Sequence, residues 1–311
     1  MFHRSRLLNL ALKVLFLLAD LIWVRKDRNL WVMAIPATDR FDGNVRALYE
    51  LVREDPTLCA PAQIKVIVSP RDAGAVAPAH RVRWGSLEHF LVLLRAGCIL
   101  YHHNYNDVGL IALPLWRCNV RVSHGIHFKC VERAQSVPDF LLRVLLSTRN
   151  MIPHHFVSSK LDAMSAVVYF HLYLPDIMIT GAAKNDLLIN RRLPDGYRHQ
   201  EERLQNRLGG RRLITYAPTW RVNGASYRFT SGEASELRAF LERENAVFGI
   251  AGHAYLKERH IPNDARFIDL NALDIDIQVV LRNTDILIHR VIEQPKFDGL
   301  TRMLVAIQVG A

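Results

Sequence analysis

Cysteine is scarce in this sequence of 311 residues, and its spacing excludes the common metal-binding motifs. The four cysteines, Cys59, Cys98, Cys118 and Cys130, are scattered and form no CxxC pair. Without paired spacing they do not match a zinc-finger pattern. They are most simply explained as reduced thiols of a cytosolic protein.

The marks of a nucleic-acid-binding protein are missing as well. The sequence has no RNP-like aromatic cluster and no lysine-rich tail. Its net charge is nevertheless +10, with a pI near 9.7. An excess of this size favours anionic partners. Nucleic acid is the weaker choice, so we expect no nucleic-acid partner. The remaining candidates for an anionic partner are an acidic membrane leaflet and a phosphorylated substrate.

Solenoid repeats and a signal-peptide cleavage site are also absent from the sequence. Secretion is therefore not expected. Half of the residues are hydrophobic and 23% are charged, which is a globular composition. The length is sufficient for two α/β domains of ordinary size.

An apolar leader occupies residues 7–24, LLNLALKVLFLLADLIWV. It is flanked by the basic residues Arg4, Arg6, Arg25, Lys26 and Arg28. At about 100° per residue, Asn9, Lys13 and Asp20 fall on one narrow line of a helix. A spanning helix would carry Lys13 and Asp20 into hydrocarbon, which is costly. An interfacial helix can turn that line toward water and its basic ends toward anionic headgroups.

We therefore expect residues 1–28 to form a membrane-interfacial helix. It would hold the protein on an anionic membrane surface, peripheral to the cell membrane on its cytoplasmic face. Two alternatives remain open for the leader. It could be a helix packed in the core of a domain, or a true span or signal anchor.

Strands and helices alternate along the rest of the chain. Strands are expected at 30–35, 64–68, 98–101, 120–122, 156–158, 176–180, 213–216, 247–250, 266–269 and 285–288. Helices are expected at 45–53, 87–96, 140–146, 159–170, 236–243 and 276–282. This alternation predicts parallel sheets with right-handed crossovers. Residues 29–189 would form one Rossmann-like domain, the polar segment 190–210 a linker, and residues 211–311 a second domain.

The second domain begins with the segment RRLITYAPTWR, residues 211–221. Its four apolar or β-favouring residues before a proline predict a buried strand that ends abruptly at a loop. Ligands of open α/β sheets bind at the carboxyl ends of strands. There the hydroxyl of Thr219, the indole N–H of Trp220 and the guanidinium of Arg221 would suit a phosphate. An ordinary loop with a surface arginine is the alternative.

The residue order of this segment resembles a family signature. YAPTWR resembles the signature of the CDP-glycerol glycerophosphotransferase family, the teichoic-acid primases and polymerases and their capsule-making relatives. The segment SHGIHFK is similar to the family's HG-x-x-x-K pattern, in which the histidine is proposed as the base that activates the acceptor hydroxyl. That resemblance makes His124 a candidate catalytic base and places Gly125 and Lys129 on the acceptor side. The family usually has tryptophan where Ser123 stands.

Two further segments support the same resemblance. GAAKND resembles the family's G-x-P-R-N-D turn and would bring Lys184 and Asn185 to the donor phosphates. Lysine here keeps the charge but loses the bidentate fork of arginine. His253, in FGIAGHAYLK, resembles the family's second histidine, which is thought to contact those phosphates, although Ala254 replaces a proline. On residue type alone, His124, His253 and the GAAKND turn could each be purely structural.

The resemblance covers roughly residues 25–288 and implies a GT-B fold, two Rossmann-like domains facing across a cleft. After Ile288 the family's donor-binding hydroxyl run is missing, so the second domain is expected to be truncated or divergent. The first domain would take the acceptor and the second the CDP-activated polyol. The resemblance implies no cofactor, and no carboxylate pair in the sequence demands a metal ion.

The implied reaction transfers glycerol phosphate, or a related polyol phosphate, from CDP-glycerol or CDP-ribitol to a hydroxyl of a lipid-linked acceptor, releasing CMP. It would serve the synthesis of a teichoic-acid-like or capsular polymer. His124 would take the proton, while Thr219, Arg221 and His253 would neutralise charge on the pyrophosphate. Two alternatives remain. The chain could be a catalytically impaired, membrane-associated remnant of such an enzyme, or a GT-B glycosyltransferase that uses another sugar nucleotide.

Overall fold

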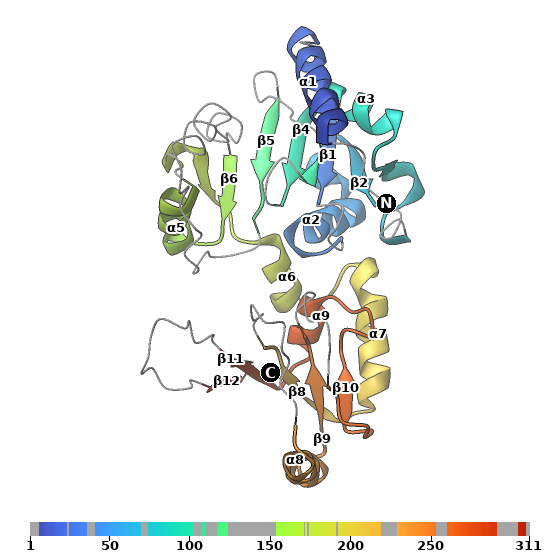
Figure 1. The fold of residues 1–311 in the computed structure, drawn as a ribbon, viewed down its shortest axis with the longest axis vertical. Coiled ribbons are helices and arrows are strands. Elements are labelled where there is room, and N and C mark those ends of the chain that lie inside the picture. Colours follow the sequence, from blue (N-terminus) through green and yellow to red (C-terminus); the bar gives the residue numbers. More distant parts are fainter. Residues whose placement is uncertain are drawn as a thin grey trace. The chain divides into compact units, whose positions relative to one another are not determined.

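The computed structural model describes most of the chain in two compact units, residues 1–186 and 187–311. The described residues are 6–23, 25–35, 41–69, 74–102, 107–109, 117–123, 154–170, 172, 174–190, 192–218, 229–252, 260–290 and 304–308. Each unit is built around its own sheet (Figure 1).

The first unit contains a seven-stranded parallel sheet in the order β3-β2-β1-β4-β5-β6-β7. The strands are β1 (Asp27–Ala34), β2 (Gln63–Val68), β3 (Arg81–Arg83), β4 (Ala96–Tyr101), β5 (Cys118–Arg121), β6 (His154–Val157) and β7 (Ile177–Ile179). The order reverses between β1 and β4, because β2 and β3 lie on one side of β1 and the later strands on the other. In open sheets such a switch point is where ligands bind.

Helices connect these strands and cover the sheet. They are α1 (Arg6–Ile22), α2 (Gly43–Glu54), α3 (Leu87–Arg95) and α5 (Lys160–Phe170). Helix α6 (Ala183–Ile189) follows β7, and the division between the two units falls within it. The 3-10 turns η1 (Pro56–Cys59), η3 (Pro78–His80) and η7 (Leu174–Asp176) lie between the helices. The alternation of side chains along β1 produces two cores. Val32 packs with Phe16 and Leu93 of α1 and α3, and Met33 packs with Tyr49 of α2.

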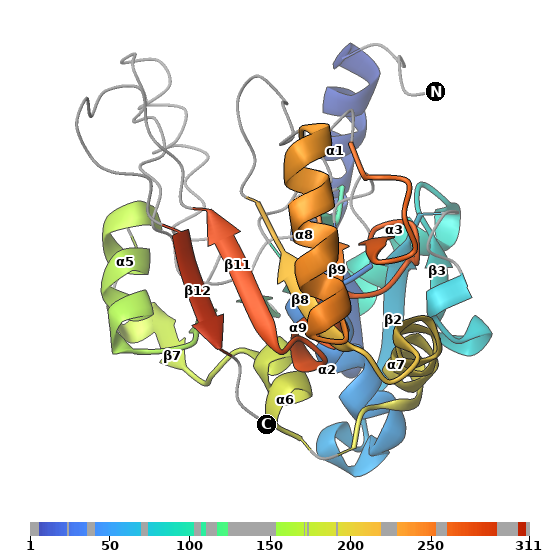
Figure 2. The same cartoon turned by 90° about the horizontal axis from the view of Figure 1, so that it is seen from below.

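The second unit contains a five-stranded sheet in the order β10-β9-β8-β11-β12, in which only β12 runs antiparallel. The strands are β8 (Arg212–Tyr216), β9 (Ala246–Ile250), β10 (Phe267–Asp269), β11 (Ile286–Arg290) and β12 (Leu304–Gln308). Its helices are α7 (Asp195–Leu208), α8 (Ser231–Arg243) and α9 (Ile277–Arg282). Figure 2 shows α8 lying along the sheet, where Leu241 packs with Phe248 of β9.

All ten expected strands are present, with ends that differ by at most three residues. The expected helix at 140–146 lies outside the described residues. The expected linker at 190–210 was wrong, because most of it is α7. Tyr197, Gln200, Leu204 and Leu208 recur at helical spacing and are buried within the many charges, and Gly209 ends the helix in the left-handed conformation.

Helix α1 is held to the first unit by a buried ionic cluster. The Asp20 carboxylate accepts a hydrogen bond from Lys26 Nζ at 2.6 Å and another from Arg117. Both cations also donate to carbonyls in the last turn of α3, Lys26 to Leu94 at 2.9 Å and Arg117 to Leu93. The side chains of Asp20, Lys26 and Arg117 are at most 2% exposed. Cations at a helix C-terminus also satisfy its last carbonyls.

This cluster overturns one expectation for the leader. Asp20 was expected to point toward water, yet it is fully buried. Its two cationic partners are Lys26, which follows the helix, and Arg117, which lies 97 positions further along the chain. The helical periodicity of residues 7–24 does not reveal either of them. Within the described residues, no helix combines the length and apolar character needed to cross a bilayer.

We predict that Asp20→Asn lowers the free energy of unfolding by about 3–5 kcal/mol, since two buried cations would lose their counter-charge. Urea unfolding monitored by circular dichroism measures this change. Glu242→Gln is the matched control, because Glu242 pairs with Arg238 at 3.0 Å on an exposed surface. Such pairs contribute about 0–1 kcal/mol. Equal losses in the two variants would contradict the buried cluster.

His89 in α3 gives the first unit a dependence on pH. Its Nδ1 accepts from Gly85 N–H at 3.0 Å, so its Nε2–H donates to the Val108 carbonyl at 2.9 Å. Burial lowers the pKa of His89 below the usual 6.5, partly opposed by the bond to Val108. The neutral ring is therefore the form that the fold accommodates.

Because the folded pKa of His89 is depressed, the unfolded chain binds the proton more tightly. The stabilisation is fully present above pH 6.5 and is lost as pH falls from 6.5 through the folded pKa. We predict that the melting temperature of the wild type falls more steeply over this range than that of His89→Gln. Thermal melts of both proteins at matched pH values test this. Parallel curves would contradict it.

Candidate functional site

The sequence motif around His124 follows β5 at the carboxyl edge of the first sheet. His124, Gly125 and Lys129 themselves lie outside the described residues. The preceding residue, Ser123, is buried and has a φ of 51°. A non-glycine residue in this left-handed region costs about 1–2 kcal/mol and persists where its surroundings impose it. The chain therefore leaves β5 through an enforced bend directly before His124.

The side chain of Asn44 imposes much of this bend. Its Nδ2 donates to the carbonyls of Val122 at 3.0 Å and Ser123 at 2.8 Å, and its Oδ1 accepts from the Lys184 N–H at 3.0 Å. Asn44 is 3% exposed and lies in the first turn of α2. One amide thus joins α2, the end of β5 and the start of α6.

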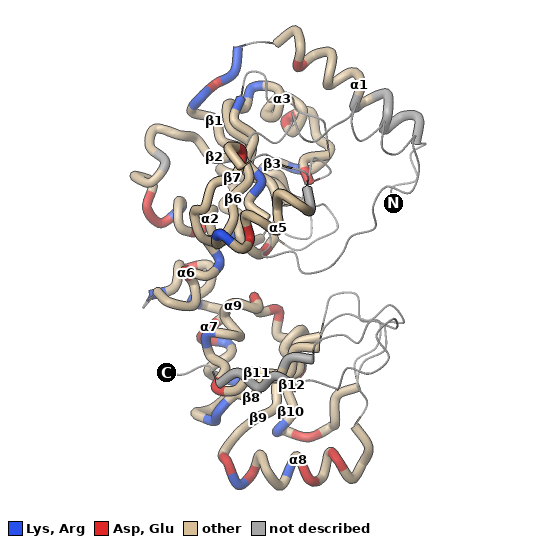
Figure 3. Tube along the Cα trace, turned by 90° about the vertical axis from the view of Figure 1, so that its left-hand side faces the viewer, with Lys and Arg blue, Asp and Glu red and all other residues tan. Residues whose placement is uncertain are grey.

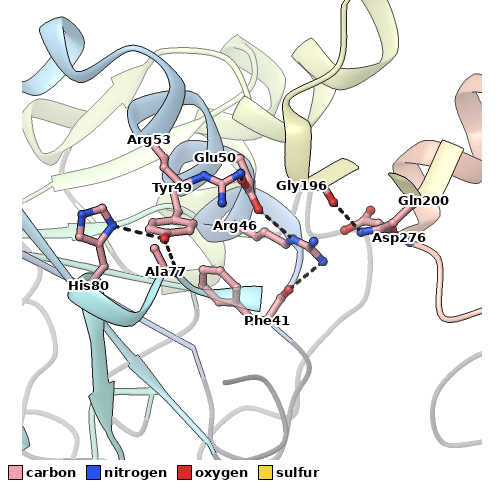
Figure 4. A network of polar contacts seen from close by, with 10 residues as sticks. All are labelled: Phe41, Arg46, Tyr49, Glu50, Arg53, Ala77, His80, Gly196, Gln200 and Asp276. Atoms are coloured by element: carbon pink, nitrogen blue, oxygen red, sulfur yellow. Dashed lines mark hydrogen bonds and ion pairs between the residues drawn. The ribbon is translucent and has the colours of Figure 1, made fainter. Parts of the chain in front are cut away.

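Helix α2 is itself anchored by polar contacts on its buried side (Figure 4). The Tyr49 hydroxyl accepts from the Ala77 N–H at 2.9 Å and lies 3.3 Å from His80 Nδ1. Glu50 pairs with Arg53 at 2.7 Å, while Arg46 lies 3.8 Å away. Burial raises the pKa values of Tyr49 and Glu50 and lowers that of His80. The Tyr49 contacts hold α2 to residues 77–80, whereas the ion pairs of Glu50 lie within the helix.

A pocket of about 170 Å³ opens beside Asn44. Its wall is mostly apolar, with one hydroxyl and one carboxylate among the lining side chains. The lining residues are Asn44, Leu48, Leu51, Val122, Phe156, Thr180, Gly181, Ala182, Ala183 and Asp186. None of them is cationic. The pocket is smaller than the roughly 300–1,000 Å³ of drug-sized sites, so it suits one small, neutral group.

Lys184 and Asn185 lie in the first turn of α6, in the segment whose resemblance predicted a phosphate-binding turn. Gly181 precedes the helix with a φ of 85°, which explains why glycine stands there. Lys184 donates its N–H to Asn44, and Asn185 is exposed. The two residues thus belong to the first unit, beside the pocket. Their binding of donor phosphate stays a prediction.

In the second unit, β8 ends at Tyr216 and the chain continues through Ala217, whose N–H donates to the Ile288 carbonyl at 3.0 Å. Thr219, Trp220 and Arg221 follow and lie outside the described residues. The strand order reverses between β8 and β11, so this motif leaves at a switch point, as a ligand-binding segment should. Behind it, the hydroxyls of Thr215 and Thr284 share a buried hydrogen bond of 2.7 Å.

The segment before His253 is fixed by Asn271, which the sequence analysis missed. Asn271 Nδ2 donates to the Gly252 carbonyl at 2.7 Å, and its Oδ1 accepts from the Gly252 N–H at 2.7 Å. His253 itself lies outside the described residues. Asn271 lies in a polar turn after β10, which no periodicity distinguishes from a loop.

The described cysteines lie away from this edge. Cys98 and Cys118 face each other at the amino ends of β4 and β5. A hydrogen bond from Cys98 lowers the pKa of the Cys118 thiol to about 7, while that bond and burial raise the pKa of Cys98. Among the residues that the structure describes, no three His, Cys, Asp or Glu side chains gather as a metal site.

The comparisons with known proteins decide the family. Residues 17–289 match the family described as CDP-glycerol:poly(glycerophosphate) glycerophosphotransferase. The chain belongs to this family. The resemblance to this family is thereby confirmed. The match begins within α1 and ends in β11, so it includes both units.

A curated relative is the teichoic acid ribitol-phosphate polymerase TarK of Staphylococcus aureus (strain NCTC 8325 / PS 47). It is 28% identical over 139 residues, which are 43% of this chain and 27% of the polymerase. The matched region thus spans about a quarter of the length of this relative.

Solved structures show the same fold. The wall teichoic acid polymerase TagF superposes with a TM-score of 0.68 at 16% identity, over 91% of this chain and 73% of TagF. A UDP-GlcNAc 2-epimerase from Methanocaldococcus jannaschii superposes with a TM-score of 0.51 at 11% identity, over 84% of this chain and 78% of the epimerase. The expectation of a GT-B type α/β fold is confirmed.

Proposed function

We propose that this protein transfers a polyol phosphate from a CDP-activated polyol to a hydroxyl acceptor in the synthesis of a teichoic-acid-like or capsular polymer. The observation that carries the proposal is the single family match across both units. It includes the carboxyl ends of β5, β8 and β9, from which the three motif segments leave.

The reaction would proceed by attack of the acceptor oxygen on the phosphorus that carries the polyol. A new phosphorus–oxygen bond forms, the pyrophosphate bond breaks, and CMP leaves. His124 takes the proton of the attacking hydroxyl, as a general base near neutral pH. Thr219, Trp220, Arg221 and His253 hold the pyrophosphate and offset the charge that develops on it, with Lys184 and Asn185 contributing.

The donor is a CDP-polyol. TagF, whose fold this chain shares, has been soaked with CDPG, and TarK is named for ribitol phosphate. Both CDP-glycerol and CDP-ribitol therefore belong in an assay. The basic excess of the chain, +10, suits such an anionic substrate.

The pocket beside Asn44 would take the hydroxyl-bearing end of the acceptor. The family resemblance assigns Gly125 and Lys129 to the same acceptor. Phe156 and Leu48 offer apolar surface to the carbon backbone of a polyol. Thr180 and Asp186 offer oxygen atoms to its hydroxyl groups. The described residues that line the pocket include no cation and one carboxylate, that of Asp186, so they suit hydroxyl groups better than a phosphate.

The acceptor is lipid-linked in this proposal, and α1 holds the protein at the cytoplasmic face of the membrane. Leu15, Leu18 and Ile22 on its outer face are 58%, 53% and 81% exposed in the first unit. Figure 3 shows basic residues directly after α1, where Arg25 and Arg28 are exposed. An apolar helix face next to basic residues suits anionic headgroups.

An impaired remnant is the second candidate. The family's hydroxyl run would follow Ile288, but here His289 and Arg290 continue β11 and pair with β12. Residues 289 and 290 therefore continue the strand and do not supply those hydroxyl groups. The third candidate is a glycosyltransferase that uses another sugar nucleotide.

We predict that the full chain releases CMP from CDP-glycerol or CDP-ribitol when a lipid-linked polyol-phosphate acceptor is supplied. His124→Ala should lower kcat by about 10²–10⁴-fold, since a general base is lost. His253→Ala should also lower turnover. Quantification of CMP by liquid chromatography measures these rates.

His199→Ala is the control, because His199 lies exposed on α7 with 83% of its side chain accessible. Its rate should equal that of the wild type. No CMP from either donor, with a folded protein, would support the remnant. Turnover of UDP- or GDP-sugars without CDP-polyol turnover would support the glycosyltransferase.

The second prediction of this proposal concerns the membrane. The wild type should co-sediment with vesicles that contain anionic phosphatidylglycerol and bind neutral phosphatidylcholine vesicles much less. The double substitution of Leu18→Glu and Ile22→Glu should abolish sedimentation, because it places charges on the apolar face of α1.

Leu87→Glu together with Ile189→Glu is the matched control. These residues are 74% and 78% exposed on α3 and α6, so the variant carries the same added charge elsewhere. It should retain most of the binding. Equal loss in both double variants would show that only net charge matters and would refute the role of α1.

A further inference from the structure

Asn44 in the first unit and Asn271 in the second have the same structural role: each side chain bonds the backbone just beyond the end of a strand. Asn44 bonds the carbonyl of Ser123, the residue directly before His124. Asn271 bonds both backbone groups of Gly252, the residue directly before His253. In each case the side chain comes from a segment outside the strand that it holds.

The first of these contacts is buried and three-fold. Asn44 uses both amide hydrogens and its oxygen, so rotation of its side chain breaks every bond at once. Its burial removes water as a substitute partner. The left-handed conformation of Ser123 is unfavourable by itself, so these bonds help to hold the bend after β5.

The second contact is a closed pairing of an amide with a backbone unit. Asn271 is itself held, because its N–H donates to Asp269 Oδ1 at 3.0 Å, and the Ala272 N–H donates to the same atom at 3.2 Å. Gly252 is buried, and its preceding residue, Ala251, donates its N–H to the Tyr216 carbonyl at 2.9 Å. The backbone at the end of β9 is therefore fixed on both sides.

We propose that Asn44 and Asn271 are positioning residues, which set the backbone from which His124 and His253 project. The inference rests on the proposed function, in which the two imidazoles meet the acceptor hydroxyl and the donor phosphates. A reacting group must be held closely, since displacement by about 1 Å lowers the rate by about 100-fold. Asn271 needs no contact with substrate for this effect, whereas Asn44 also lines the pocket proposed for the acceptor.

Substitution by aspartate is the sharpest test. In Asn44→Asp the lysine N–H keeps its acceptor, but an oxygen replaces the amide hydrogens that face the carbonyls of Val122 and Ser123. In Asn271→Asp the Gly252 N–H keeps its acceptor, and the Gly252 carbonyl loses its donor. Each variant thus removes the bond on the histidine side and leaves an acceptor in place.

Asn283→Asp is the matched control. Asn283 also bonds a backbone carbonyl, that of Val279 at 2.8 Å, and accepts from Gln205 at 2.5 Å. It ends α9 and precedes no candidate histidine. It therefore reports the cost of the same substitution in a structural role.

We expect Asn44→Asp and Asn271→Asp to lower kcat for CMP release by about 10–100-fold, with KM for the CDP-polyol changed less than threefold in Asn44→Asp. Asn283→Asp should keep both constants within threefold of the wild type. If the two aspartate variants fail to fold, Asn44→Ser and Asn271→Ser replace them, because a hydroxyl makes one bond and not the pair. Circular dichroism melts confirm folding in each case.

A second readout needs no activity. In NMR spectra of the histidine-labelled protein, Asn44→Asp should shift or broaden the imidazole signal of His124 and leave His253 unchanged. Asn271→Asp should do the reverse, and Asn283→Asp should change neither. Signals are assigned with the single variants His124→Ala and His253→Ala.

The outcomes separate the two proposals. A wild type without CMP release, but with the expected pattern of imidazole shifts, would refute the proposed function and retain the positioning role. An active wild type whose asparagine variants match Asn283→Asp in both readouts would overturn the positioning role. Equal disturbance of both imidazoles by every variant would also overturn it, because the effect would then be general destabilisation.

Discussion

Parallel strand pairing imposes the main constraint on this protein. Neighbouring parallel strands end at the same edge, so residues far apart in sequence come together where the strands stop. In the first unit this edge collects the end of β5, the first turn of α2 and the start of α6. Beyond the strand ends, where backbone pairing stops, the buried side-chain amide of Asn44 makes hydrogen bonds to the backbone of Val122, Ser123 and Lys184. The second unit repeats this solution with Asn271 and Gly252.

Helix α1 shows how one segment serves two requirements. Its inner face carries Phe16, whose ring centroid lies 5.1 Å from that of Phe90 in an edge-on contact, and Asp20, which pairs with both Lys26 and Arg117. The outer face stays apolar and exposed in the first unit. A helix without Asp20 would lack the ion pairs that attach α1 to the first unit. A helix with a polar outer face would lack the exposed apolar surface of Leu15, Leu18 and Ile22. The charge on Asp20 therefore fixes which side of the helix faces the protein.

Much of the fold could be predicted from the sequence because strand signals in parallel sheets are local. Runs such as 30–35 and 64–68 are apolar and β-branched, and they appear as β1 and β2. Short or polar elements were missed for physical reasons. Strand β3 has only three residues, Arg81–Arg83, which is too short for a clear pattern. In α7 the four buried positions are separated by charged residues, which made the segment look like a polar linker. Helix α6 begins in the segment that resembled a turn.

The sequence by itself determined the family, the alternation of strands and helices, and the motif segments that follow β5, β8 and β9, since each depends on residues adjacent in the chain. Only the tertiary structure decided which groups those segments meet. Asn44 reaches the carbonyl of Ser123, 79 positions away, and Asp20 reaches Arg117 across 97 positions. Asn271 reaches Gly252 across 19 positions. Such partners are chosen by strand order and burial, which periodicity along one segment does not encode.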